Sequence, residues 1–270
     1  MTNIATASNQ SETNRPRVAA STYLNSAPLV WSFLHGSRRN EIEHVEAVPA
    51  RCADLLAGGE VDVALVPVIE YKRIPDLILV PDVCVGSRAE VRSVVLATRE
   101  SDLGSLRKIA LDESSRTSAA LLKIIFREFV GSEPEWRTSV PDIEAMLKEN
   151  DAALIIGDPG MTFPRANLNV FDLASVWRQY TGFGFVFAMW MLRQDASENA
   201  RKIDFLAACQ EGLERSAEIL DYYEQRLGLT RDELETYLKD NISFFLTDEM
   251  QAGLDLYYEL AHKHGLIGSL

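Results

Sequence analysis

The sequence lacks the motifs that mark the common metal and nucleotide sites. It contains no HExxH, CxxC, GxxxxGK[ST] or GxGxxG, and it has only four histidines in 270 residues. Its three cysteines, Cys52, Cys84 and Cys209, are far apart and stand in apolar surroundings. We therefore expect no metal ion, no cofactor and no histidine-based catalytic triad, and we interpret the cysteines as buried reduced thiols.

Positive charge and long apolar runs are also scarce. The net charge of −13 argues against general binding to nucleic acid or to an anionic membrane, but it leaves room for a small anion in a pocket. The most apolar run, FGFVFAMWML at residues 183–192, is about half of the ~20 residues that a membrane span needs. The first residues are polar and show no secretory pattern, so we expect a disordered leader over residues 1–16 and a cytoplasmic protein.

Short buried strands alternate with amphipathic helices from Arg17 onward. This alternation predicts an α/β fold with mostly parallel sheets and a ligand site at the carboxyl ends of the strands. Two such runs predict two lobes with a cleft between them. We assign residues 17–98 and 185–270 to the first lobe and residues 99–184 to the second. Within the second, we interpret residues 157–160 as a turn and residues 176–181 as part of the return crossing.

Short polar side chains stand at four predicted strand ends, where plain connections would serve. They are Tyr23, Asn25 and Ser26; Ser87 and Arg88; Ser114, Ser115, Arg116, Thr117 and Ser118; and Asp158. Helix capping alone explains any one of these groups. Together they lie where a pocket is expected, and a helix that starts at such a group offers free N–H groups to an anion. The pattern predicts a pocket rich in hydroxyl and amide groups, suited to a small polar anion.

Six segments in register resemble one enzyme family. They are RVAASTYLNSAPL, LLAGGEVDVALVPVIEY, VGSRAEVRSVVL, IALDESSRTSAALLKIIF, ALIIGDPGM and DLASVWRQYTGFGFVFAMWMLR. Over about residues 17–193 the chain resembles the chorismate dehydratases of the futalosine-dependent menaquinone pathway, whose chains open with a strand and a Tyr-Leu-Asn-x-x-Pro-Leu turn. A sister family, 1,4-dihydroxy-6-naphthoate synthase, usually opens with a Ser-Pro-Cys-Pro-Asn-Asp type of turn, which this chain lacks.

The resemblance implies a two-lobed, type 2 periplasmic-binding-protein-like fold with a ligand cleft between the lobes. It implies an enzyme that dehydrates chorismate to 3-[(1-carboxyvinyl)oxy]benzoate, with catalytic roles for Asn25 at the departing hydroxyl and for Ser87 across the cleft. The substrate-binding residues that follow from it are Tyr23, Ser26, Arg88, Ser114, Ser115, Arg116, Thr117, Ser118, Asp158, Thr181 and Gly182. Asp158 serves equally well as a turn residue, and Thr181 and Gly182 as hinge residues.

The strand ends offer no obvious histidine or glutamate base, so we hypothesise that the enolpyruvyl carboxylate of the substrate takes the ring proton. The alternatives are a non-catalytic binding protein for a small anion and the sister synthase. We expect chorismate as the partner, with no nucleic acid and no membrane. The long C-terminal amphipathic helices allow a homodimer, but they are equally able to pack on their own lobe.

Overall fold

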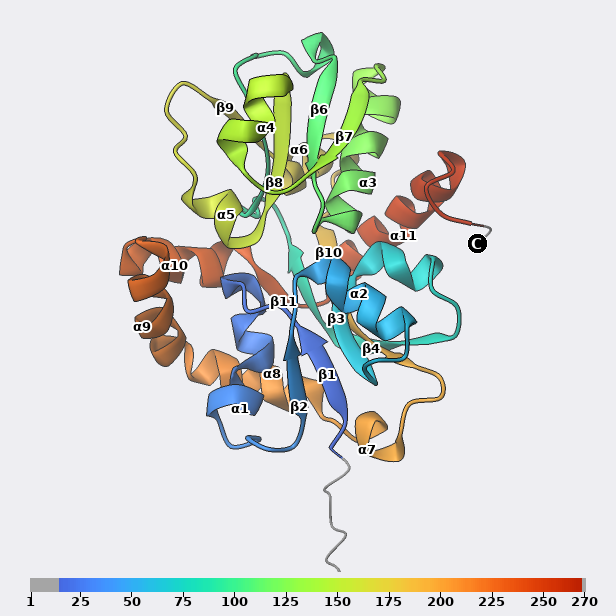
Figure 1. Ribbon diagram of the computed structural model, residues 1–270, viewed down its shortest axis with the longest axis vertical. Helices are drawn as coiled ribbons and strands as arrows, with labels where there is room; N and C mark the ends of the chain where they lie inside the picture. The colour runs from blue at the N-terminus through green and yellow to red at the C-terminus, as the bar shows by residue number, and fades with distance from the viewer. Residues whose placement is uncertain (1–14, 269–270) are drawn as a thin grey trace, which may run out of the picture.

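The computed structural model describes residues 15–268, which form two α/β lobes, drawn one above the other in Figure 1. The first lobe contains a six-stranded sheet of order β11-β4-β10-β3-β1-β2. Its strands are β1 Arg17–Ala20, β2 Glu43–Glu46, β3 Val63–Pro67, β4 Leu77–Ser87, β10 Phe185–Arg193 and β11 Ser243–Phe245. Strand β1 runs parallel to β2 and β3, whereas β10 and β11 run antiparallel to their neighbours.

The second lobe contains a five-stranded sheet of order β7-β6-β8-β5-β9. Its strands are β5 Val94–Thr98, β6 Lys108–Asp112, β7 Glu135–Ser139, β8 Ala152–Ile156 and β9 Asn169–Asp172. Strand β6 is parallel to β7 and β8, and β5 is antiparallel to β8 and β9. Both sheets are therefore mixed, and the prediction of mostly parallel sheets was wrong, because a strand's apolar pattern says nothing about the direction of its neighbour.

Helices cover both sheets, and their ends follow local sequence signals. They are α1 Ala27–His35, α2 Pro49–Ala57, α3 Arg116–Ile125, α4 Ile143–Glu149, α5 Gly157–Thr162, α6 Leu173–Thr181, α7 Glu198–Arg201, α8 Phe205–Glu214, α9 Ser216–Leu227, α10 Arg231–Thr236 and α11 Asp248–Lys263. Helix α2, for example, begins at Pro49 and ends before Gly58, as proline and glycine preferences at helix ends predict. Helix α3 continues as a π-helical turn at Phe126–Val130.

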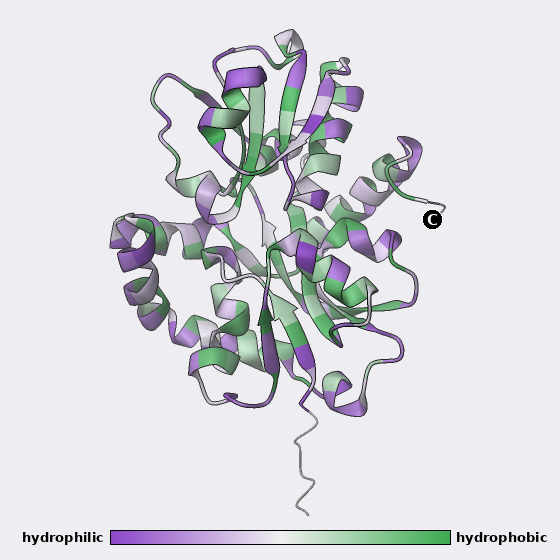
Figure 2. Ribbon diagram, viewed as in Figure 1, coloured by the Kyte–Doolittle hydropathy of each residue, from purple (hydrophilic) through white to green (hydrophobic). Residues whose placement is uncertain are grey.

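The hydrophobic core runs through both sheets. Strands β3, β5 and β8 are buried along their whole length, which is why they read as uninterrupted apolar runs. Figure 2 shows hydrophobic colour along the buried strand β8 and hydrophilic colour on the outer helices α9 and α10. Cys52, Cys84 and Cys209 are free and buried, as predicted. Among the described helices, none combines the length and the apolar character that a membrane crossing needs.

The structure differs from the sequence prediction at two connections of the second lobe. Residues 157–160, predicted as a turn, begin helix α5, and residues 176–181, predicted as part of the crossing, belong to helix α6. A Gly-Asp-Pro-Gly run favours a turn, but Pro159 also fits the first turn of a helix, where its missing N–H has no partner to lose. The predicted leader, residues 1–16, lies almost wholly outside the described residues.

The chain passes between the lobes at two neighbouring places. Strand β5 pairs with β8 and β9, so the first passage lies between β4 and β5, ahead of the boundary predicted at residue 98. The second passage joins α6 to β10. Ser87, at the end of β4, is the register partner of Phe185, at the start of β10. The two passages therefore leave the first lobe side by side.

Candidate functional site

A cavity lies between the two lobes, at strand ends and helix starts. Its lining is made of Ser21, Tyr23, Asn25, Ser26, Pro49, Leu65, Pro67, Val85, Phe187 and Ala188 from the first lobe, and Val94, Ser114, Ser115, Arg116, Thr117, Ser118, Ile156 and Gly157 from the second. The centre of a water molecule has about 50 Å³ available in it, several times the ~10–15 Å³ that one water needs. The cavity therefore has room for a few water molecules in this position of the lobes.

The segment from Ser21 to Ser26 forms the first wall, and its side chains are joined in a hydrogen-bonded row. Ser21 Oγ and Ser26 Oγ are 2.9 Å apart, and Ser26 Oγ donates to Asn25 Oδ1 at 3.1 Å. Since each hydroxyl has one proton, Ser21 donates to Ser26, which donates to Asn25. The row fixes the amide oxygen of Asn25 within the protein and leaves the amide N–H₂ as a donor for a bound molecule.

Tyr23 lines the cavity and packs on Gly157. Gly157 has a φ of +65°, and a Cβ at this position would lie 2.6 Å from the Tyr23 ring. Only glycine meets both demands, the left-handed backbone and the close approach of the ring. Burial raises the pKa of Tyr23 to about 12, with further contributions from the nearby carboxyls of Asp112 and Asp158. The phenol is therefore neutral at pH 7 and acts as a hydrogen-bond donor rather than as a base.

Asp158 ties the first wall to the second lobe without lining the cavity. Its Oδ1 accepts a hydrogen bond from the backbone N–H of Leu24 at 2.9 Å. Burial raises the pKa of Asp158 to about 6, against the lowering effect of that hydrogen bond and of Arg226. Asp158 thus lies in the first turn of α5, and its hydrogen bond to Leu24 orients the 21–26 segment.

The first residues of α3 form the second wall. Ser115 is the N-cap residue, but its side chain makes no capping hydrogen bond. Ser114 is held by the buried carboxylate of Asp112, whose Oδ1 accepts from the Ser114 backbone N–H at 2.9 Å and from Ser114 Oγ at 2.6 Å. The capping explanation considered for these residues therefore does not account for Ser115. Free N–H groups in the first turn and hydroxyls beside them make this wall a place for an anion.

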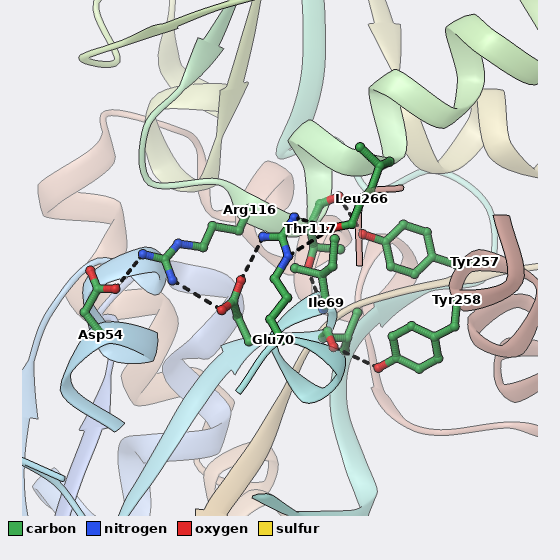
Figure 3. Close-up of polar contacts among 10 residues, drawn as sticks. Asp54, Ile69, Glu70, Arg116, Thr117, Tyr257, Tyr258 and Leu266 are labelled. Carbon is green, nitrogen blue, oxygen red and sulfur yellow. Dashed lines mark hydrogen bonds and ion pairs between the residues drawn. The ribbon is translucent and has the colours of Figure 1, made fainter. Parts of the chain in front are cut away.

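Arg116 lines the cavity, but its guanidinium is paired outside it. Nη2 lies 2.6 Å from Asp54 Oδ1 and Nη1 lies 3.3 Å from Glu70 Oε2, both in the first lobe (Figure 3). Burial lowers the pKa of Arg116, but the hydrogen bonds and charges of Asp54 and Glu70 outweigh burial and raise it. Among the described residues that line the cavity, none is Asp, Glu, His or Lys.

Besides Asp158, four of the predicted site residues lie outside the cavity. Ser87 is buried, and its hydroxyl donates to the carbonyl of Glu90 at 2.8 Å and accepts from the Ala89 N–H at 3.3 Å. Arg88 is exposed. Thr181 Oγ1 donates to the Trp177 carbonyl, and Gly182 ends α6 with a φ of +79°. These residues belong to the two passages between the lobes, and a direct contact of Ser87 with a bound molecule requires its turn to rearrange.

The apolar part of the lining was not predicted. Val85, Phe187 and Ala188 come from β4 and β10, whose apolar residues serve the core of the first lobe over most of their length. Nothing in the sequence separates the side chains that face the cavity from their neighbours in the core. The buried carboxylate of Asp112, which also accepts from the Ile156 N–H at 3.2 Å, was likewise missed as a positioning group. Its place at the end of β6, two residues before Ser114, was the available signal.

Two α/β lobes with a cavity between them define the class of periplasmic-binding-protein-like folds. The protein AF1704 from Archaeoglobus fulgidus matches with a TM-score of 0.78, 22% identity, and coverage of 95% of this chain and 100% of that one. The periplasmic aliphatic sulphonate-binding protein SsuA from Escherichia coli matches with a TM-score of 0.62, 17% identity, and coverage of 94% and 88%. At these identities the likeness shows the fold alone.

The sequence comparisons go further than the fold. The profile of the family described as "Menaquinone biosynthesis" matches residues 16–263. A chorismate dehydratase from Thermus thermophilus is 32% identical over an alignment of 256 positions that covers 88% of this chain and 92% of the relative. The chain belongs to the menaquinone biosynthesis family.

Proposed function

We propose that this protein is a chorismate dehydratase, which removes water from chorismate to give 3-[(1-carboxyvinyl)oxy]benzoate. The observation that carries the proposal is the 32% identity to the Thermus thermophilus enzyme across nearly the whole of both chains. The cavity supports it independently, because it joins an amide donor on one wall to a helix N-terminus on the other. The likeness to the sulphonate-binding protein extends to the fold and favours no second function.

The reaction requires few acid–base groups from the protein. A ring C–H bond breaks, its electron pair completes the aromatic ring, and the ring C–O bond breaks to release the hydroxyl, which leaves as water with the proton. Aromaticity supplies the thermodynamic drive. The protein has to hold the ring, stabilise the departing hydroxyl and place a base near the ring proton, and fixed dipoles in the cavity between the lobes perform the first two tasks.

The proton acceptor is proposed to be the enolpyruvyl carboxylate of the substrate itself. The described lining contains no carboxylate, histidine or lysine. Its phenol, Tyr23, keeps its proton because burial raises its pKa to about 12. The paired guanidinium of Arg116 is no base either. An analogue that lacks this carboxylate and still loses water at an equal rate would contradict the proposal.

The two walls take different parts of the substrate in this proposal. The amide N–H₂ of Asn25 donates to the ring hydroxyl that leaves, and the Ser21–Ser26 row keeps that amide oriented. A carboxylate of the substrate is received at the start of α3 by Ser115, Thr117 and Ser118. The role of Ser87 as a catalytic partner stays a prediction, as do contacts from Arg88, Thr181 and Gly182.

The test is incubation of the pure protein with chorismate. We expect loss of the cyclohexadiene absorbance together with a product whose mass is lower by one water. Intact chorismate after prolonged incubation, combined with tight binding of some other anion, would overturn the enzyme in favour of a binding protein. A cytoplasmic location is part of the proposal, supported by three buried free thiols, and a homodimer stays a prediction that sedimentation decides.

A further inference from the structure

Among the described residues that line the cavity, Arg116 is the only charged one. Its guanidinium forms ion pairs with two carboxylates of the opposite lobe. Arg116 starts α3 in the second lobe, Asp54 belongs to α2 and Glu70 follows β3 in the first. Figure 3 shows the guanidinium of Arg116 between these two carboxylates. Both ion pairs therefore exist only while the two lobes are in this relative position.

Glu70 is held firmly on the side of the first lobe. Its side chain is only 4% exposed, and Oε1 lies 3.1 Å from Arg73 Nη1. The guanidinium of Arg73 in turn donates to the carbonyl of Leu266 at 3.3 and 3.0 Å. A buried carboxylate needs charged or hydrogen-bonded partners for each oxygen, and Oε2 finds its partner in Arg116. Glu70 is thus a fixed receptor for a cation from the other lobe.

Uncharged contacts accompany the ion pairs on the same side of the cavity. The backbone N–H of Ile69 donates to Thr117 Oγ1 at 3.3 Å, and the Ala50 N–H donates to the Ser114 carbonyl at 3.2 Å. Tyr257, from α11, donates to the Thr117 carbonyl at 3.1 Å. These bonds hold the start of α3 against the first lobe. The lobe position in which Arg116 forms its ion pairs is therefore also the position in which the second wall is in place.

We propose that Arg116 closes the cleft rather than binding a substrate carboxylate, and that Glu70 and Asp54 are the positioning residues that fix it. The carboxylate is then received by the neutral donors at the start of α3, the hydroxyls of Ser115, Thr117 and Ser118 and the N–H groups of the first turn. The two ion pairs of Arg116 hold the lobes in this relative position. The substrate carboxylate is bound by uncharged donors alone, with no positively charged side chain in contact with it. The identity of the anion rests on the proposed function, but the closing role of Arg116 does not.

The experiment uses Asp54→Asn, with Glu60→Gln as its matched control. Asp54 is half exposed, so its loss leaves the fold intact, and Glu60 pairs with Arg51 within the first lobe. Asp54→Asn is expected to raise KM for chorismate about threefold with kcat unchanged, because an exposed ion pair contributes modestly. Glu70→Gln, which removes the buried pair, is expected to raise KM about tenfold. The control should match the wild type.

A substrate-binding role for Arg116 predicts the opposite sign. Removal of either carboxylate would then free the guanidinium, and KM would stay the same or fall in Asp54→Asn, which overturns the closing role. In an Arg116→Met background the closing role predicts that Asp54→Asn changes nothing further, and an unchanged threefold effect there would also overturn it. If Glu70→Gln fails to fold, the Asp54 comparison decides.

Small-angle X-ray scattering separates this proposal from the proposed function. The ligand-free Arg116→Met protein, which loses both ion pairs, is expected to have a larger radius of gyration than the wild type and the Glu60→Gln control, because the lobes part. Asp54→Asn, which keeps the Glu70 pair, is expected to lie between them. Equal radii in all four proteins would overturn the closing role. A protein that leaves chorismate intact but shows the larger radii would refute the dehydratase while upholding the closing role.

Discussion

The two walls of the cavity are built from the same kinds of residue and have different chemistry. The first wall, residues 21–26, is a row of side chains that bond to one another and leave one amide free. The second wall, residues 114–118, presents the start of a helix, where hydroxyls stand beside backbone N–H groups. A neutral amide suits a neutral leaving hydroxyl, and a helix N-terminus suits a negative charge.

The comparison shows that composition alone does not assign roles within a polar pocket. Serine occurs in both walls, but Ser26 serves to orient Asn25, whereas Ser115 has a hydroxyl free of capping. Both walls lead into a helix, α1 after Ser26 and α3 after Ser115. The difference arises from the side chains, since the Ser26 hydroxyl is engaged by Ser21 and Asn25. Loss of a first-wall group should therefore change kcat, and loss of a second-wall group should change KM.

The largest expected effect is that of Asn25→Ala. Removal of a donor that acts on the leaving group should lower kcat about 100-fold, with little change in KM or in the melting temperature. Steady-state kinetics and thermal unfolding provide the check, with Asn25→Asp as an isosteric companion that also lacks the amide donor. A normal kcat in both variants would remove the first wall from the chemistry.

Gly157→Ala tests whether the first wall has to reach the second lobe. A side chain at φ +65° is strained and would meet the Tyr23 ring at 2.6 Å, so we expect a loss of about 1–3 kcal/mol in the free energy of unfolding and a clear fall in turnover. Gly131→Ala is the matched control, because its φ is +74° and nothing lies within 4 Å. Equal effects of the two changes would show that the Tyr23 contact is unimportant.

The contact between Asp158 and the first wall should depend on pH. Burial raises the pKa of Asp158 from 3.8 to about 6, so the folded protein retains a proton that the unfolded chain releases. The contribution of this group to stability is full below pH ~4 and is lost as the pH rises through 6. Asp158→Asn keeps an oxygen acceptor for Leu24 without ionising.

Asp158→Asn should therefore gain stability relative to the wild type between pH 4 and pH 7, by roughly 1–3 kcal/mol, since a tenfold change in proton affinity is about 1.4 kcal/mol. Urea unfolding of both proteins at the two pH values measures it. The difference between variant and wild type cancels the contributions of Asp112 and Asp172, whose pKa values burial also raises. A difference that is the same at both pH values would refute the prediction.

Ser115→Ala has the smallest expected effect. It should raise KM about threefold to tenfold and leave kcat unchanged, because it removes one donor to a bound carboxylate. The helix should keep its stability, since no capping hydrogen bond is lost. The control is Ser105→Ala, an exposed serine of the same lobe that bonds to the Asp102 carbonyl. A fall in kcat instead of a rise in KM would erase the distinction between the two walls.

The sequence identified much of the polar lining because strand ends and helix starts have local signatures. Asn25 and Ser115 follow apolar strands, and the segments around them match a family pattern. The partners of Arg116 had no such signature, since Asp54 and Glu70 are 62 and 46 residues away in the chain. Ser87 matched the family pattern but lies outside the cavity, because its hydroxyl is used by its own turn.

The sequence could not predict to which of the two sheets β5 belongs, for a similar reason. Residues 94–97, VVLA, are all apolar, and β5 is buried along its whole length. Such a strand fits the interior of either sheet. Only its pairing with β8 and β9 places it in the second lobe. Local patterns thus predicted which residues form strands, while contacts between distant segments decided the position of the boundary.

The adjacent passages between the lobes have a consequence for how this chain is organised. All five strands of the second sheet come from one continuous stretch, which starts after β4 and returns at β10. Because Ser87 and Phe185 are register partners, this stretch leaves and re-enters the parent lobe at a single point. In engineering terms the second lobe is an inserted cassette. If it were exchanged for that of a relative, the new segment would be joined to the first lobe at two neighbouring positions, and the six-stranded sheet would stay whole.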